Sequence, residues 1–221
     1  MANASESWAK MTGDPQRLNN VTLLQRWCSA WADLLHADMA LLEHHELPAK
    51  PSTVFHRRAL WESAVISYGR CSVSDQKRDI PFKELVREAT GDEGIALHER
   101  ILDWRHGHVA HRKRSEFESV ETVLAFPSGA RNHAALRLVL SVQAEPEDDT
   151  GIVAAFEQHV KTVRDFMYEN RVRPISKSVI ADLNAGLLTL SELQPAADQS
   201  TRARLVITQN LLEVSATRRL D

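Results

Sequence analysis

The segment that decides the fold reads Asp103-Trp104-Arg105-His106-Gly107-His108-Val109-Ala110-His111-Arg112 and ends a predicted amphipathic helix. On a regular helix, Ile101 and Val109 fall within about 40° of Arg105, which centres this arginine on the apolar face. His98 lies close to the same line, and His108 lies about 60° away. A guanidinium that faces a core is costly unless it is paired or opens onto a polar cavity. We therefore expect a functional site or a subunit interface at Arg105.

The composition is that of a soluble, globular and largely helical protein. The chain has 221 residues, enough for one substantial core, and 26% of them are charged and 43% hydrophobic. Only 8 glycines and 8 prolines interrupt the long apolar segments, which favours helices over a β-sandwich. Because the formal net charge is −3, any contact with RNA or DNA has to come from local basic patches.

The cysteines and the lack of long apolar runs indicate the compartment. Cys28 and Cys71 are too few for a disulfide framework, and each lies in a helical apolar pattern, so we expect free thiols in a reducing environment. The first twenty residues contain no apolar signal segment, and no uncharged run approaches the roughly 18 residues of a membrane span. We expect a cytoplasmic protein without a membrane partner.

Apolar spacings of three and four residues predict a mainly α fold. Apart from a helix that starts at residue 92 or 93 and ends in the histidine-rich segment, the predicted helices cover residues 21–47, 52–71, 81–89, 151–170 and 175–193. Asn20 is the expected N-cap of the first helix, and Thr90-Gly91-Asp92 should end the short third one. We expect a flexible leader over residues 1–19, a single domain over residues 20–193 and a tail over residues 194–221.

Between residues 118 and 144 the pattern changes from helical spacing to strict alternation. Two alternating runs, around Val120–Phe126 and Leu136–Val142, flank a segment rich in turn-forming residues at 127–132. This arrangement predicts a two-stranded antiparallel hairpin over about residues 118–144. Because an isolated hairpin is only marginally stable in water, we expect it to pack on the helices or on a partner chain.

Arg105 is followed six residues later by His111, late in the predicted helical core. This spacing resembles the signature of the HEPN superfamily (higher eukaryote and prokaryote nucleotide-binding domains). The abortive-infection branch is similar in two further stretches, Leu60-Trp61-Glu62-Ser63-Ala64-Val65-Ile66-Ser67-Tyr68-Gly69-Arg70-Cys71 and the ending Arg105 to His111. The resemblance covers roughly residues 21–171. The chain departs from the commonest form of the family by having His106 where an asparagine or aspartate is usual.

The resemblance implies a HEPN-like up-and-down helical bundle, to which the hairpin is an elaboration. It also implies a homodimer in which the same helix of each protomer faces its partner, so that two arginines and two histidines line one cleft. The implied activity is that of a metal-independent endoribonuclease of a defence or toxin system, without a cofactor. RNA is the implied substrate, and an antitoxin or regulatory protein is a possible further partner.

In such an enzyme Arg105 and His111 would be the catalytic residues. His111 can move a proton near neutral pH, and Arg105 can hold a phosphate and stabilise its developing charge. On a regular helix the two side chains point about 120° apart, so a two-fold pairing or unwinding at Gly107 would have to bring them together. The supporting substrate-binding candidates are His108, His106, Arg70, Tyr68 and Arg112.

Several simpler interpretations remain open for the same residues. Arg105 can be a structural cation paired with a carboxylate such as Glu62 or Asp38, and His111 can be an exposed helix C-cap. The three histidines of the segment could bind a transition metal, but only His108 and His111 share a helix face and no acidic ligand is evident nearby. The alternatives at the level of function are a catalytically silent HEPN-like module that binds a nucleotide or a protein, and a structural helical oligomerisation protein.

Overall fold

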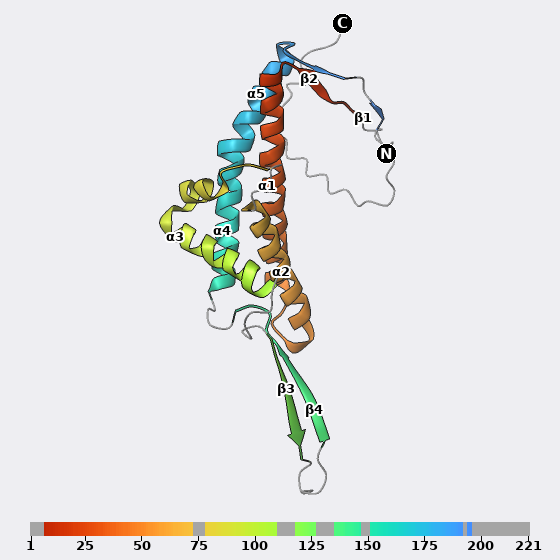
Figure 1. The fold of residues 1–221 in the computed structure, drawn as a ribbon, viewed down its shortest axis with the longest axis vertical. Helices are drawn as coiled ribbons and strands as arrows, with labels where there is room; N and C mark the ends of the chain where they lie inside the picture. The colour runs from red at the N-terminus through yellow and green to blue at the C-terminus, as the bar shows by residue number, and fades with distance from the viewer. Residues whose placement is uncertain are drawn as a thin grey trace. The chain divides into compact units, whose positions relative to one another are not determined.

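The computed structural model describes residues 7–72, 78–109, 118–126, 135–146, 151–191 and 194–195, and these residues are mainly helical (Figure 1). The helices are α1 (Pro15–Glu46), α2 (Val54–Cys71), α3 (Phe82–Trp104), α4 (Ile152–Met167) and α5 (Arg173–Asn184). π-helical turns at Arg105–Val109 and Tyr168–Val172 follow α3 and α4, and a short 3₁₀ turn, Pro51–Thr53, precedes α2. Among the described residues, no helix is long and apolar enough to cross a membrane.

The strands form three separate two-stranded antiparallel ribbons in the described part of the chain. β1 (Ser7–Trp8) pairs with β6 (Gln194–Pro195), β2 (Met11–Gly13) pairs with β5 (Leu188–Leu190), and β3 (Glu118–Ala125) pairs with β4 (Ala135–Val142). The chain divides into two compact units, one of residues 1–25 with 169–221 and the other of residues 26–168. The candidate site and the hairpin β3–β4 both belong to the second unit.

In the first unit, the beginning of α1 packs with α5 and the β2–β5 ribbon around Val21, Val179 and Leu188. The leader expected over residues 1–19 therefore contains a strand and the first turn of a helix. Asp14, rather than Asn20, caps α1, because its Oδ1 accepts a hydrogen bond of 2.7 Å from the backbone N–H of Gln16. Pro15 at the first helical position follows this cap, a combination that helix starts favour.

The helix expected over residues 175–193 was predicted too long. α5 ends at Asn184, and Gly186 adopts a left-handed conformation with φ +70°. A glycine in this conformation is the usual terminator of a helix, because other residues rarely adopt it. The chain then extends into β5, where Leu188 is buried and pairs with Gly13.

In the second unit, aromatic side chains from α2, α3 and α4 meet in the core. The ring of Trp61 lies edge-on to Trp104 and to Phe156, with centroids 5.4 and 5.6 Å apart. Edge-to-face pairs of this kind add to the gain from burying apolar area. Arg164 of α4 forms an ion pair with the buried Asp38, which ties α1 to the same core.

The predicted break at Thr90-Gly91-Asp92 is confirmed as a kink inside α3. Gly91 has φ 69° and ψ −166°, a conformation that a side chain would strain, and it divides the helix into two segments. The C-terminal segment buries Ile95, His98, Ile101 and Trp104. Arg105 follows directly on this buried stripe, as the sequence spacing predicts.

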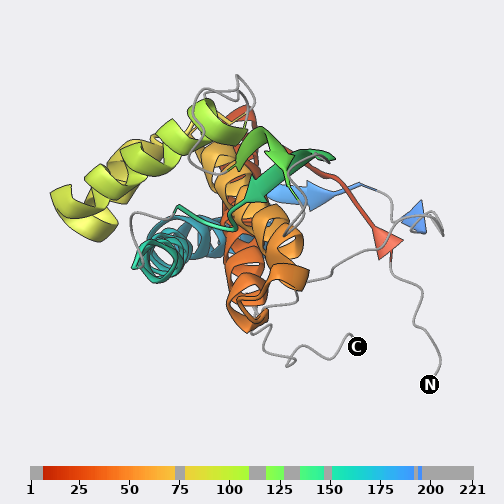
Figure 2. The same cartoon turned by 90° about the horizontal axis from the view of Figure 1, so that it is seen from below.

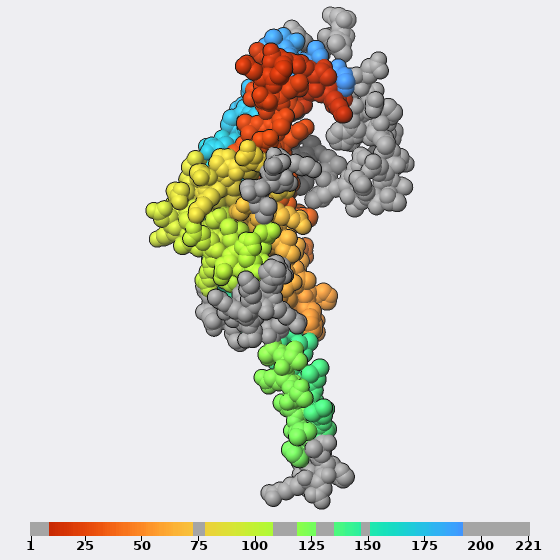
Figure 3. Space-filling model, in the orientation of Figure 1, coloured from red at the N-terminus to blue at the C-terminus, as the bar shows by residue number. Residues whose placement is uncertain are grey.

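The predicted hairpin is also confirmed, with Val120 opposite Leu140 and Leu124 opposite Leu136. In the space-filling view its two strands stand clear of the helices over most of their length (Figure 3). The hairpin was expected to pack on the helices or on a partner chain. Its packing on the helices is limited to its base.

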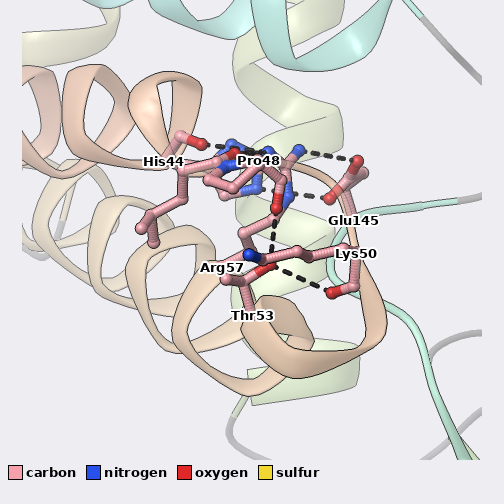
Figure 4. A network of polar contacts seen from close by, with 7 residues as sticks. His44, Pro48, Lys50, Thr53, Arg57 and Glu145 are labelled. Atoms are coloured by element: carbon pink, nitrogen blue, oxygen red, sulfur yellow. Dashed lines mark hydrogen bonds and ion pairs between the residues drawn. The ribbon is translucent and has the colours of Figure 1, made fainter.

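A polar network fixes that base to the turn between α1 and α2 (Figure 4). Arg57 donates hydrogen bonds to the carbonyl oxygens of His44 and Leu47, at 3.1 and 2.6 Å, and to Glu145 Oε1 at 3.0 Å. The other carboxylate oxygen of Glu145 lies 3.2 Å from Nε2 of the buried His44. Burial, followed by the charge of Arg57, lowers the pKa of His44. One guanidinium thus joins the end of α1, the start of α2 and the segment that leaves β4.

We expect Arg57→Ala to lower the free energy of unfolding by about 2 kcal/mol, because three acceptors lose one charged donor. Urea denaturation followed by far-ultraviolet circular dichroism measures this change. Glu145→Gln keeps a hydrogen-bond acceptor at the same place and should cost clearly less. Equal effects of the two substitutions would contradict the central role of Arg57.

Candidate functional site

Arg105 lies half-buried where the end of α3 meets α2, an approach visible from below (Figure 2). Its side chain crosses α2 at Gly69: a Cβ placed on Gly69 would come within 2.1 Å of Cδ and 2.9 Å of Nε of Arg105. Any larger residue at position 69 would have to displace the arginine. The glycine of the Tyr68-Gly69-Arg70-Cys71 stretch therefore provides the space for this side chain.

Neither acid considered from the sequence pairs with Arg105 among the described residues. Asp38 forms its ion pair with Arg164, and Glu62 accepts a hydrogen bond of 2.6 Å from Arg58 Nε, one turn earlier on α2. The interpretation of Arg105 as a structural cation bound to one of these two acids is therefore wrong. Its guanidinium is half-buried without a salt bridge to either of them.

The five residues that follow α3, Arg105–Val109, form a π-helical turn. A π turn is wider than an α turn and is frequent at functional sites. Angles counted on a regular helix therefore no longer hold beyond Arg105, including the predicted 120° between Arg105 and His111. His106 is exposed. The side chain of His108 and the whole of His111 and Arg112 lie outside the described residues.

Arg70 is 53% exposed in its side chain and lies 3.9 Å from the carboxylate of Asp33. The same carboxylate also binds Arg78, so it is shared by two arginines. Arg70 lines an open depression of about 340 Å³, together with Ser63 and Glu62 of α2 and His36 of α1. Its charge is therefore partly neutralised but accessible to an anion.

Tyr68 does not reach the surface, so the prediction that it contacts a substrate is wrong. Its side chain is 0% exposed, and its hydroxyl lies 2.8 Å from Nδ1 of His98 and 2.7 Å from Nε2 of His159. A tyrosine hydroxyl can donate to one ring nitrogen and accept from the other, so the hydroxyl and one nitrogen of each neutral histidine have partners. The ring of Tyr68 also packs edge-on against Phe82 and Phe156.

Burial keeps this network neutral. It lowers the pKa of His98 to about 4, with a smaller effect from Lys83, and it lowers the pKa of His159 to about 4, with a smaller effect from His98. Burial also raises the pKa of Tyr68 well above its usual value. At neutral pH the three groups therefore hold hydrogen bonds rather than charges.

The network fixes the place where Arg105 crosses α2. Tyr68 is the residue before Gly69, and His98 lies about two helical turns before Arg105 on the same buried stripe of α3. The hydroxyl bond from Tyr68 to His98 thus sets the register of α2 against α3, and His159 adds α4 to the same joint. We regard these three residues as positioning residues for Arg105.

The position of His159 in the sequence indicates a buried polar contact. On α4 it lies between Phe156 and Val163 on the apolar stripe, and all three side chains are buried. A histidine at such a position needs a polar partner in the core. His98 shows the same signal on α3, and Tyr68 is the partner that satisfies both.

The thiol of Cys71 has no features of a nucleophile. It is buried and free, and it lies 3.5 Å from the carbonyl oxygen of Ala30. Burial raises its pKa, which disfavours the reactive thiolate. Within the described residues, no group of three or more histidine, cysteine or acidic side chains is arranged to hold a metal ion.

Comparisons with known proteins add no assignment. No protein-family model matches the chain, and neither the curated proteins nor the solved structures gave a significant match. Any functional proposal therefore depends on the residues and geometry of this chain.

A double-mutant cycle tests the crossing of Arg105 over Gly69. In the native background Gly69→Ala should destabilise the protein, because the new Cβ meets the arginine side chain. In an Arg105→Ala background the same substitution should stabilise α2 by up to about 1 kcal/mol, since alanine is a better helix former than glycine. Urea denaturation of the four proteins measures the coupling, and additive effects would show that the two residues do not meet.

The buried histidines make stability dependent on pH. Their folded pKa of about 4 lies below the ordinary value of 6.5, so between these limits the unfolded chain binds protons that the folded chain does not. The free energy of unfolding should therefore fall as the pH drops from about 6.5 to about 4.

Replacing one histidine should reduce this slope. His159→Gln retains a side chain that can hydrogen bond to Tyr68 but does not titrate. We expect its slope between pH 4.5 and 6 to be smaller than that of the native protein by about 1 kcal/mol per pH unit. Identical slopes from urea denaturation across this range would contradict a depressed pKa at His159.

Proposed function

We propose that this protein is a metal-independent endoribonuclease of a defence or toxin system, with Arg105 and His111 from each of two protomers forming its catalytic site. The observation that carries the proposal is the position of Arg105. It lies half-buried across a glycine and pairs with neither Asp38 nor Glu62, the two acids considered from the sequence. A half-buried arginine kept in this way is suited to bind a phosphate.

The surroundings of Arg105 add to this support. It opens a π-helical turn that leads towards the histidines, and Arg70 provides a second accessible cation on the neighbouring helix. Below it, the neutral network of Tyr68 holds α2 and α3 in register. The resemblance of the Arg105 to His111 segment to HEPN proteins points to the same pair of residues.

The reaction that fits these residues is transesterification within RNA. A histidine removes the proton of the 2′-hydroxyl, whose oxygen attacks the adjacent phosphorus. The bond from phosphorus to the 5′-oxygen breaks, and that oxygen takes up a proton from a histidine in its imidazolium form. The products are a 2′,3′-cyclic phosphate and a 5′-hydroxyl. Arg105 would stabilise the additional negative charge on the phosphate oxygens in the transition state.

The roles of the other candidates follow from their places. Arg70 and His106, both accessible, would contact the RNA backbone, as would His108 and Arg112 from the segment that continues towards His111. Tyr68 acts only by positioning α2. A catalytically silent module that binds a nucleotide would use the same cations without the proton transfer, and the experiment below separates the two functions.

The test is cleavage of RNA by the purified protein in excess EDTA, with Arg105→Ala and His111→Ala beside it. We expect the native protein to leave cyclic-phosphate ends, detected by mass spectrometry, and each variant to be slower by about 10²-fold or more. Arg137→Ala, which removes an exposed arginine from β4, is the matched control and should keep full activity.

Three outcomes would overturn the proposal. Cleavage that persists in both variants would come from another site. A folded native protein that binds RNA through Arg105 but does not cleave a range of RNAs would be the silent binding module. A rate that stays flat between about pH 5 and 8 would contradict proton transfer by His111.

A further inference from the structure

One face of the hairpin β3–β4 is apolar and exposed from the pair Val120–Leu140 towards the tip. The pairs Val120–Leu140, Thr122–Leu138 and Leu124–Leu136 share this face, because directly opposed residues point to the same side of a ribbon. Phe126 continues it towards the tip. We call this surface the apolar hairpin face, and its members are Val120, Thr122, Leu124, Phe126, Leu136, Leu138 and Leu140.

The exposure of this face is unusually large. Leu136 and Leu138 are each 72% exposed, and Phe126 is 61% exposed. With roughly 150–200 Å² for a fully exposed large apolar side chain, the face presents about 600 Å², at the upper limit of the apolar patches on typical monomers. The opposite face of the ribbon is mixed, because it carries Glu121 and Arg137 as well as Val123 and Val139. The apolar side chains on that face are also less exposed than those of the apolar hairpin face.

The apolar hairpin face continues into a depression at the base of the hairpin. This base pocket has a volume of about 790 Å³, and its apolar lining includes Leu140 and Val142 of β4, Val54 and Phe55 of α2, and Val153 of α4. Phe55 is itself 64% exposed. The pocket is the place where the network of Arg57 and Glu145 fixes the hairpin to the helices, so its walls are held in place (Figure 4).

The composition of the apolar hairpin face favours a second copy of this chain as its binding partner. From Val120 to Phe126 the face carries no charge, and Thr122 is its single polar member; Glu118, at the base of β3, is the first charged residue in the same register. Over this stretch two identical copies can approach each other without repulsion between like charges. A two-fold contact requires a surface that is complementary to itself in this sense. Two such faces would bury about 1,200 Å² in total, which reaches the range of stable protein–protein interfaces.

The length of the strands also favours a second copy. Eight residues of strand span about 26 Å. When two hairpins stack with their apolar faces together and their directions opposed, the tip of each one comes to the base of the other. Phe126, at the tip, then lies over the base pocket of the partner, which provides an apolar space for it.

We infer that two copies of this chain associate through their apolar hairpin faces in an antiparallel stack, with Phe126 of each copy seated in the base pocket of the other. This interface uses a surface different from the Arg105 turn. It also supplies the cover that a two-stranded ribbon needs for stability. The inference does not depend on the proposed nuclease activity.

The first experiment measures molar mass by sedimentation equilibrium of the full chain. The native protein should have the mass of two chains, and the double variant L136S/L138S the mass of one. The matched control V123S/V139S changes two apolar residues on the opposite face of the same ribbon, exposed to 37% and 39%, and should stay dimeric. Circular dichroism confirms that each variant keeps its helices.

A second experiment tests the antiparallel arrangement. The double variant F55C/F126C should form a disulfide between chains under mild oxidation, seen as a dimer on a non-reducing gel. F126C alone should not, because the two tips lie at opposite ends of the stack. A cross-link with F126C alone would show a parallel arrangement and overturn the stated geometry.

Three results would overturn the association itself. These are a monomeric native protein, a dimer that persists in L136S/L138S, and loss of the dimer in V123S/V139S as well. Arg105→Ala is expected to remain dimeric. A dimer that dissociates in Arg105→Ala but not in L136S/L138S would place the contact at the α3 end, which the nuclease proposal needs and the hairpin proposal does not.

Discussion

The second unit depends on the hydrogen bonds of one hydroxyl, that of Tyr68, which lies between the rings of His98 and His159. It joins α2, α3 and α4 at one point in an otherwise aromatic core. A buried polar group that is fully satisfied specifies one arrangement, because sliding either helix would leave a hydroxyl or a ring nitrogen without a partner. Packing of apolar rings alone tolerates such shifts more easily.

This constraint has a direct consequence for the charged residues near the surface. Since the network is neutral, positive charge comes from Arg105, where α3 meets α2, and from the exposed Arg70 of α2, not from the buried histidines. The place of Arg105 is set by the absence of a side chain at Gly69, one residue from the tyrosine. Three consecutive residues of α2 thus have different roles: Tyr68 forms the buried network, Gly69 leaves space for Arg105, and Arg70 is exposed.

The sequence predicted elements well wherever one local pattern decided the structure. The kink at Gly91, the hairpin with its alternation, and the buried stripe that leads to Arg105 are all of this kind. The start of α1 was misplaced because an apolar pattern beginning near Val21 was given more weight than the capping pair Asp14–Pro15. The predicted end of α5 is too late because the apolar spacing continues through Leu188, although Gly186 stops the helix and the strand needs a partner far away in sequence.

The candidate site was harder to predict, because its contacts join distant parts of the chain. The sequence makes Tyr68 a candidate substrate contact beside Arg70, but α2 turns these neighbours to opposite environments. Tyr68 and His159 are 91 residues apart in the sequence, and no local pattern indicates that their side chains form a hydrogen bond. The wider turn after Arg105 could not be inferred either, since apolar spacing does not distinguish a π turn from an α turn over five residues.

The two proposals place different demands on assembly. A composite nuclease site needs two copies to meet at the end of α3, whereas the apolar hairpin face pairs two copies elsewhere. Both contacts can exist in one closed dimer only if a single two-fold axis relates the copies at both places. With two different axes, each copy would bind two others and the protein would form chains. A protein that remains a dimer at high concentration therefore either has one common axis or uses only one of these surfaces.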